Sequence, residues 1–182
     1  IENLRHFNTV FREGEEVIIT EKIHGTSSRC SLIYDNNQWL RIAGSKTMQR
    51  KYVENSLYWF PWTLPSVSSF MEEMKSYAQQ QIILCGEIYG KVQKLRYGLP
   101  NSYGYAAFGL KIDEKYVDAE DFYFGDRFKN IPKVPVISVE KFNMESIIEH
   151  SKGKSLIPGA NHIREGVVVY PVRERTDPAV GR

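Results

Sequence analysis

The sequence predicts an α+β fold, in which antiparallel sheets are covered on the outside by a few helices. Two observations lead to this prediction. Most apolar residues occur in short runs bounded by turn residues, as is typical of strands, and helical spacing is confined to three segments. The chain has 182 residues, of which 42% are hydrophobic and 13% aromatic, which suits one domain with a substantial core.

Short apolar runs separated by turns give the expected strands. Asp35-Asn36-Asn37-Gln38 is a hairpin signal, because asparagine adopts left-handed conformations readily, and Asp113-Glu114 is a second turn. The strands are expected at residues 16–22, 28–34, 38–43, 82–88, 104–112, 115–118 and 165–171.

Three helices are expected between these strands. The first opens at Pro65, with Ser68 or Ser69 as its cap and an apolar stripe formed by Phe70, Met74 and Tyr77. The others cover residues 119–128 and 144–151, and the last of them should turn Ile147 and Ile148 inward.

Charge and composition exclude few classes of function. The net charge is +2, and basic residues gather in three places that could be solvated faces or parts of a phosphate-binding groove: Lys46, Arg50 and Lys51; Lys91, Lys94 and Arg96; Arg173 and Arg175. No apolar run is long enough for a membrane span, and no signal peptide is visible. Cys30 and Cys85 are expected to be free thiols, which favours a reducing, cytoplasmic location, and no zinc spacing occurs.

The segment Thr20-Glu21-Lys22-Ile23-His24-Gly25-Thr26 is the most informative part of the chain. Lys22 stands at the end of the apolar run that begins at Val17, just before a glycine turn. An amine that is partly removed from water loses its proton more readily and can act as a nucleophile. Taken alone, K-x-x-G is a weak signal, and a strand-end lysine beside a turn is the ordinary interpretation.

Three later segments fit with the lysine segment in order and spacing. Two place a carboxylate, Glu87 or Glu165, at a strand end beside a glycine, Gly86 or Gly166, which would let a ligand approach the backbone. One is a strand with a central aromatic residue, Phe108. The segments are Ile82-Ile83-Leu84-Cys85-Gly86-Glu87-Ile88-Tyr89-Gly90, Tyr105-Ala106-Ala107-Phe108-Gly109-Leu110-Lys111-Ile112 and Glu165-Gly166-Val167-Val168-Val169-Tyr170.

Together these segments resemble the covalent nucleotidyltransferases. The words E-K-I-H-G-T, G-E-I-Y-G followed by V-Q-K-L-R-Y-G, and E-G-V-V-V-Y-P are similar to the ATP-dependent RNA ligases, in particular the branch that seals nicks in duplex RNA. The resemblance covers residues 17–182 and implies a nucleotidyltransferase (ATP-grasp-like ligase) domain of antiparallel sheets with flanking helices. It also implies RNA repair as the setting.

The resemblance also implies the roles of the site residues. Lys22 would attack ATP to form lysyl-AMP, Glu165 would assist the lysine and bind Mg²⁺ (or Mn²⁺), Glu87 would bind the ribose, and Phe108 would stack on adenine. Nucleotide contacts are further expected from Glu21, Ile23, His24 and Lys46. For His24 a turn-packing role is the open alternative, and Lys46 stands where the family usually has arginine, so it keeps the charge but not the bidentate fork. Ser27 replaces the usual asparagine.

The partners implied are ATP and RNA with 5′-phosphate and 3′-hydroxyl ends, without a membrane, and a monomer is expected. We interpret residues 1–182 as one adenylyltransferase domain. Members of the family add a strand with two lysines after a segment like 176–182, and then a C-terminal RNA-binding domain; we expect both to lie outside these 182 residues. The aromatic-rich segment 51–65 is expected in the core, with an exposed platform near RNA as the alternative.

Other functions stay open at this point. A DNA ligase or a GTP-dependent capping enzyme is the nearest alternative, although K-I-H-G stands here in place of their K-x-D-G. A degenerate, non-catalytic RNA-binding relative is the alternative from a different class of function. The presence of Lys22, Glu87 and Glu165 argues against it.

Overall fold

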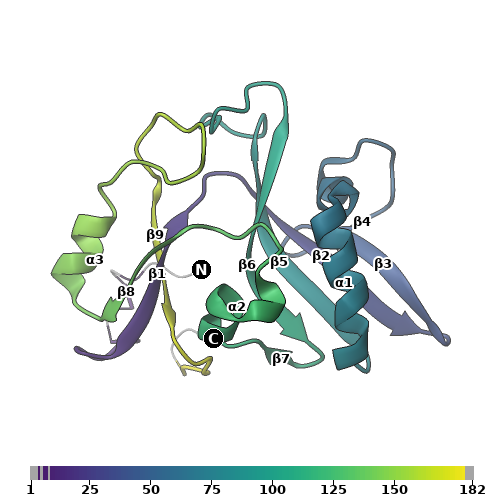
Figure 1. The fold of residues 1–182 in the computed structure, drawn as a ribbon, viewed down its shortest axis with the longest axis horizontal. Coiled ribbons are helices and arrows are strands. Elements are labelled where there is room, and N and C mark those ends of the chain that lie inside the picture. Colours follow the sequence, from purple (N-terminus) through teal and green to yellow (C-terminus); the bar gives the residue numbers. More distant parts are fainter. Residues whose placement is uncertain (1–3, 5, 8, 179–182) are drawn as a thin grey trace.

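The computed structural model describes residues 4, 6, 7 and 9–178, and the α+β prediction is confirmed (Figure 1). The larger sheet of the described chain has six antiparallel strands in the order β4-β3-β2-β5-β6-β7. These are β2 (Thr26–Asp35), β3 (Gln38–Gly44), β4 (Gln49–Arg50), β5 (Gln81–Gly90), β6 (Tyr103–Ile112) and β7 (Lys115–Tyr116).

A second, three-stranded sheet has β1 (Glu16–Lys22) at its centre. It pairs antiparallel with β8 (Val136–Lys141) on one side and with β9 (Gly166–Pro171) on the other. Sequence analysis missed β8, because its residues are only partly buried or exposed and it has no buried apolar run. The connection from β1 into β2 joins the two sheets.

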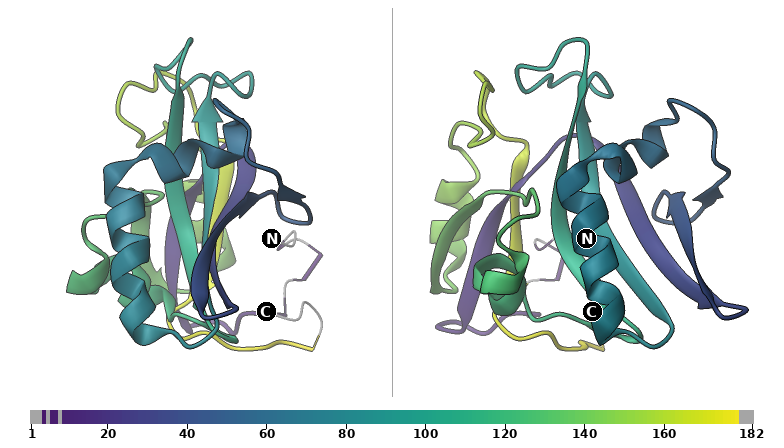
Figure 2. Two further views of the ribbon diagram at one scale, coloured as in Figure 1. Left: turned by 90° about the vertical axis from the view of Figure 1, so that its right-hand side faces the viewer. Right: turned by 45° about the vertical axis from the view of Figure 1, so that its right-hand side comes forward.

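Helices lie on the outside of the sheets, as predicted. They are the 3₁₀ turns η1 (Leu57–Thr63), η2 (Lys75–Tyr77) and η3 (Asp126–Phe128), and the α-helices α1 (Pro65–Met74), α2 (Ala119–Phe124) and α3 (Met144–His150). Helix α1 lies across one face of the six-stranded sheet (Figure 2).

Three details of the helix predictions were wrong. Helix α1 begins with Pro65 in its first turn after Leu64, so neither Ser68 nor Ser69 caps it; the Ser68 hydroxyl donates to the carbonyl of Trp62 instead. Tyr77 is 48% exposed because α1 ends before it. Ile148 is 44% exposed, so of the two isoleucines only Ile147 is buried.

The core has two parts that meet at β1. The larger part lies between the six-stranded sheet and α1, and the smaller part lies under α3. Ile18 belongs to the larger part, whereas Val17 and Ile19 belong to the smaller one. Since both faces of β1 are covered, its sequence is a continuous apolar run rather than an alternating one.

The aromatic-rich segment 51–65 divides between core and surface. Trp62 is 7% exposed, and its indole N–H donates to the carbonyl of Ile42. Tyr52 is 69% exposed and contacts Trp59 edge-on. The core interpretation therefore holds for the η1 end, and the beginning of the segment is exposed.

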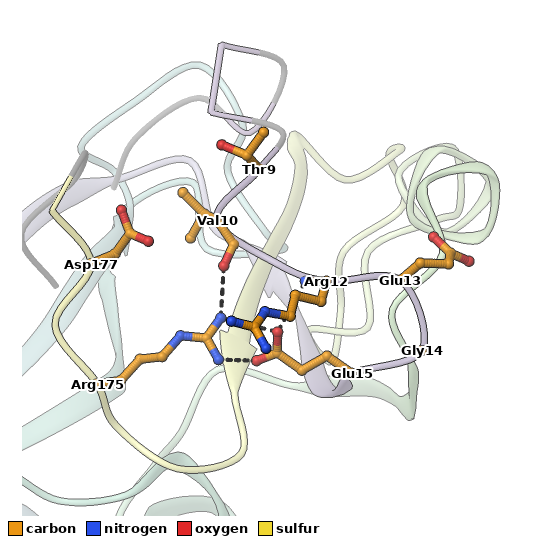
Figure 3. A pocket seen from close by; sticks show the side chains of 8 residues that line it. All are labelled: Thr9, Val10, Arg12, Glu13, Gly14, Glu15, Arg175 and Asp177. Carbon is orange, nitrogen blue, oxygen red and sulfur yellow. Dashed lines mark hydrogen bonds and ion pairs between the residues drawn. The ribbon is translucent and has the colours of Figure 1, made fainter.

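Arginines after β9 fasten this end of the chain to earlier segments. Arg173 pairs with Asp118 and Glu120 beside α2. Arg175 pairs with Glu15 and donates to the carbonyl of Val10 at 2.7 Å, beside a cavity of about 680 Å³ (Figure 3). Both arginines are thus engaged by protein groups, which favours a structural role over phosphate binding. Residues 179–182 of the segment expected before a lysine strand lie outside the described residues.

Gly86 serves packing rather than ligand approach, contrary to the sequence expectation. A side-chain carbon built on Gly86 would lie 2.4 Å from the ring of Tyr105, which is 4% exposed and packs over this glycine. Gly86 lies on the buried face of β5, opposite to the face of its neighbour Glu87. Gly166, in contrast, has nothing within 4 Å of such a carbon.

We predict that Gly86→Ala lowers the free energy of unfolding by about 1–3 kcal/mol, because the ring of Tyr105 or the strand must shift. Urea unfolding measures the effect. Gly166→Ala is the matched control and should leave stability within about 0.5 kcal/mol of the parent. Equal stability of the two variants would contradict the packing assigned to Tyr105.

Candidate functional site

Strand pairing brings Lys22 and Glu165 into direct contact. Lys22 is the last residue of β1, and the antiparallel register places it opposite Gly166, the first residue of β9. Glu165 precedes Gly166, and its Oε1 lies 2.5 Å from Lys22 Nζ. The two side chains are 38% and 32% exposed. The pair therefore stays open to a ligand from solvent.

His24 approaches the same carboxylate from the connection between β1 and β2. Its Nδ1 lies 3.5 Å from Glu165 Oε2, so one carboxylate faces both Lys22 and His24 through its two oxygens. The backbone N–H of His24 donates to the hydroxyl of Tyr97 at 2.7 Å. The backbone of His24 can therefore hold the turn while its ring faces a ligand.

Strand β5 adds Glu87 to the charged residues Lys22 and Glu165. Glu87 lies opposite Ser27 on β2, and burial raises its pKa to about 7. The charge of Lys22 and the backbone N–H of Gly25 lower the pKa of Glu87, and the charge of Glu165 raises it. These couplings mean that Lys22, Glu87 and Glu165 share one electrostatic environment.

Gly25 allows this close arrangement. A side-chain carbon on Gly25 would lie 2.2 Å from the carbonyl oxygen of Ile88 and 2.9 Å from the side chain of Glu87. The backbone at residue 25 therefore approaches β5 more closely than any other residue type permits. The sequence signal K-x-x-G thus has a steric cause in this structure.

Lys46 joins Lys22 and Glu165 at a cavity of about 780 Å³. It is exposed in the turn after β3, where the backbone N–H of Ser45 donates to the carbonyl of Met48. The cavity is also lined by residues 166–171 of β9. Glu87 and Phe108 are not among the described residues that line it, so the structure brings Lys46 to the same cavity as Lys22 but not to these two.

Phe108 lies at an irregularity of β6. Ala107 pairs with Gly86 and Gly109 pairs with Cys85, so Phe108 is an extra residue between two consecutive pairs. Its side chain is half-buried and packs against the larger core. The ring therefore packs on the core and keeps part of its surface exposed.

Glu21 and Ile23 direct their side chains away from solvent. Ile23 is 6% exposed and belongs to the larger core. Glu21 is 1% exposed, and its Oε2 accepts a 2.6 Å hydrogen bond from the backbone N–H of Leu156. Successive side chains of a strand point to opposite faces, so the buried Glu21 and the accessible Lys22 follow from β1 itself.

Sequence reasoning missed Tyr97 and His162. Tyr97 is 1% exposed and touches His24 through its hydroxyl, and His162 packs edge-on against the Tyr97 ring. The one available signal was a bulky residue before glycine in V-Q-K-L-R-Y-G, which the structure explains by a φ of 51° at Tyr97 and 73° at Gly98.

Two further findings concern the residues that the structure describes. Within residues 4, 6, 7 and 9–178, no three His, Cys, Asp or Glu side chains gather closely enough to hold a metal ion by themselves. Over the same residues, every helix is too short or too polar to cross a lipid bilayer.

We predict that Glu87 makes stability depend on pH. Its folded pKa is raised from 4.5 to about 7, so the folded chain binds this proton more tightly than the unfolded chain. Its stabilising contribution is complete below pH 4.5 and is lost as the pH rises through about 7. The free energy of unfolding, relative to Glu87→Gln, should fall by up to about 3 kcal/mol across this window.

Urea unfolding of the parent and of Glu87→Gln at several pH values measures this difference. Glu54→Gln, which changes an exposed glutamate of the segment 51–65, is the control and should follow the parent. If Glu87→Gln and the parent changed in parallel with pH, the pKa of Glu87 would not be raised.

Known proteins share this fold. An RNA ligase from Naegleria gruberi, solved as a variant with ATP and Mn, superposes with a TM-score of 0.68 at 15% identity, covering 88% of this chain and 47% of that chain. A second variant, with AMP and Mn, gives 0.69 and 15% with coverages of 88% and 48%. A third variant, without ligand, gives 0.69 and 16% with coverages of 95% and 51%. The chain thus spans about half the length of these structures.

A search of curated proteins finds no match to the chain. The sequence model of one family, described as RNA ligase, matches residues 15–181. This match extends over nearly the whole chain and includes Lys22, Glu87, Phe108 and Glu165. The chain therefore belongs to the RNA ligase family.

Proposed function

We propose that this chain is the adenylyltransferase domain of an ATP-dependent RNA ligase that seals nicks. One observation carries the proposal: the 2.5 Å contact between Lys22 Nζ and Glu165 Oε1, with His24 beside the other oxygen. The two variants of the Naegleria gruberi RNA ligase, which have the same fold, were solved with ATP or AMP and Mn, and this supports a nucleotide as the ligand of the site.

Lys22 is the nucleophile of the first step. Its ammonium group must first lose a proton, and Glu165 Oε1 already accepts a hydrogen bond from it. The nitrogen lone pair then forms a bond to the α-phosphorus of ATP, and the bond from that phosphorus to the bridging oxygen breaks. Pyrophosphate leaves with the electron pair, the nitrogen releases a second proton to solvent, and lysyl-AMP remains.

The other residues bind and orient ATP. Glu87 accepts hydrogen bonds from the ribose hydroxyls when it is ionised, and Phe108 stacks on adenine through the exposed part of its ring. Lys46 lies at the Lys22 cavity as a cation for phosphate oxygens. Because the side chains of Glu21 and Ile23 are buried, these two residues would contact the nucleotide through their backbones.

The described residues fit a divalent metal that the substrate helps to hold. Mg²⁺ is commonly bound by one or two carboxylates together with substrate phosphates, so the lack of a three-ligand group among residues 4, 6, 7 and 9–178 agrees with it. Glu165 would hold this ion. When bound, the metal supplies positive charge that offsets the charge of the phosphates.

RNA enters in the later steps. An oxygen of the RNA 5′-phosphate forms a bond to the AMP phosphorus, and the bond from that phosphorus to Lys22 breaks, so that the amine recovers its proton. The RNA 3′-hydroxyl then bonds to the 5′-phosphate, AMP leaves, and the nick is closed. We expect the ligase to act as a monomer.

We predict that Lys22→Ala abolishes covalent labelling, because Lys22 alone among the described residues contacts Glu165 with a primary amine. The assay incubates the natural protein with α-labelled ATP and Mg²⁺ or Mn²⁺, followed by a denaturing gel and mass spectrometry. Glu165→Ala should also abolish labelling, and Glu87→Ala should weaken it strongly.

Lys115→Ala, on the remote strand β7, is the matched lysine control and should label like the parent. An AMP adduct on a lysine other than Lys22 would refute the assignment. Labelling by GTP alone would indicate capping chemistry, and RNA binding by a folded parent that takes no label from ATP would indicate a non-catalytic relative.

We predict that Phe108→Leu weakens ATP binding by about 1–3 kcal/mol and leaves the fold intact, because stacking is lost while most of the packing volume remains. Calorimetry measures the affinity, and thermal unfolding measures the fold. Phe60→Leu changes another half-buried aromatic that packs on the same core and should not alter ATP affinity. If Phe108→Leu lowered stability without changing affinity, the ring would be a core residue.

A further inference from the structure

Tyr97 lies where three connections meet. It belongs to the connection between β5 and β6, and it contacts both the β1–β2 connection and the segment between α3 and β9. The β5–β6 connection and the α3–β9 segment pass close together, since a side-chain carbon on Gly98 would lie 2.7 Å from the carbonyl oxygen of Gly159 (Figure 1).

The backbone of Tyr97 is held in a conformation that bulky residues rarely adopt. Its φ is 51°, and the side chain is nonetheless almost fully buried at 1% exposure. Such a conformation persists only where surrounding contacts impose it, and it is commonest at functional sites. Tyr97 is therefore fixed rather than adaptable.

The hydroxyl of Tyr97 fixes His24. It accepts a 2.7 Å hydrogen bond from the backbone N–H of His24, two residues after Lys22. Burial raises the pKa of Tyr97 to about 12, the bond from His24 lowers it, and the charges of Glu21, Glu165 and Glu87 raise it further. The hydroxyl thus stays neutral, and its oxygen accepts the hydrogen bond from His24.

The ring of Tyr97 fixes the segment that carries Glu165. It meets the ring of His162 edge-on, with centroids 4.6 Å apart and planes at 82°. His162 Nδ1 lies 2.8 Å from the carbonyl oxygen of Ile163, and this contact orients the imidazole. His162 is only three residues before Glu165 in the sequence. On another side, Tyr89 contacts the Tyr97 ring with centroids 5.1 Å apart.

We propose that Tyr97 is a positioning residue for lysine adenylylation, which couples His24 to the segment of Glu165. The inference rests on the proposed function, since it concerns how the same site is held for reaction. Glu165 reaches Lys22 and His24 with different oxygens, so a small shift of either connection breaks one of the two contacts. Reaction rates are sensitive to such displacements because the attacking nitrogen must lie close to the α-phosphorus and in line with the bond that breaks.

The test compares Tyr97→Phe with Tyr89→Phe in the full-length natural protein. Tyr97→Phe keeps the ring against His162 and removes only the acceptor of His24. At saturating ATP, the rate of Lys22–AMP formation should fall about tenfold, with the half-saturating ATP concentration changed by less than about threefold. Tyr89→Phe removes a hydroxyl from the neighbouring ring, for which the described chain shows no hydrogen bond, and should leave both values unchanged.

Two further measurements separate positioning from general packing. The amide of His24 should be protected from hydrogen exchange in the parent and should exchange about tenfold faster in Tyr97→Phe. His162→Ala removes the edge-on contact and should lower the rate of Lys22–AMP formation in the same way, with little change in half-saturating ATP. If Tyr97→Phe does not fold, the rate measured for His162→Ala tests the proposal instead.

The proposal is overturned if Tyr97→Phe retains the parent rate, if Tyr89→Phe loses as much, if His162→Ala retains the parent rate, or if the His24 amide of the parent is unprotected. Failure of the proposed function has a different signature, because the parent itself would then take no label from ATP. In that case the exchange of the His24 amide still decides whether Tyr97 holds this connection.

Discussion

The site depends on the antiparallel pairing of β1 with β9. This register places Lys22 opposite Gly166 and so puts the carboxylate of Glu165 against the lysine amine. A shift by one residue would turn Lys22 to the other face of the sheet, because side chains alternate along a strand. Such a shift would also remove the buried carboxylate of Glu21 from the backbone N–H of Leu156 that it binds.

Three carboxylates near one lysine acquire different properties from their burial. Glu165 is partly exposed and paired with Lys22, which suits a group that meets a ligand. Glu87 is more buried, and the cost of a buried charge raises its pKa to about 7. Glu21 is closed off from solvent, and its Oε2 accepts a hydrogen bond from the backbone N–H of Leu156 in the segment that leads to Glu165. The same residue type thus occurs in an accessible ion pair, in a buried position with a raised pKa and in a fully buried hydrogen bond.

The close approach of the connections gives the site its shape. Gly25 lies against the carbonyl of Ile88, and Gly98 lies against Gly159, so backbone meets backbone without side chains between. The Naegleria ligases reach the same fold at 15% identity with a TM-score of 0.68, which indicates that strand pairing, rather than most individual residues, specifies the architecture. Where a larger side chain does enter this region, as at Tyr97, it is fixed by contacts on several sides.

Local signals in the sequence were enough to predict the α+β class, seven of the strands, and the family, because apolar runs, turn residues and the motifs around Lys22, Glu87 and Glu165 can each be recognised within a short segment. Features that depend on distant partners emerged only from the folded chain. Among them are β8, which is paired without being deeply buried, and the irregularity that sets Phe108 between two pairs of β6. Gly86, which accommodates the ring of Tyr105 instead of a ligand, is another. Register, ring packing and side-chain burial arise between segments far apart in the chain, so no local pattern contains them.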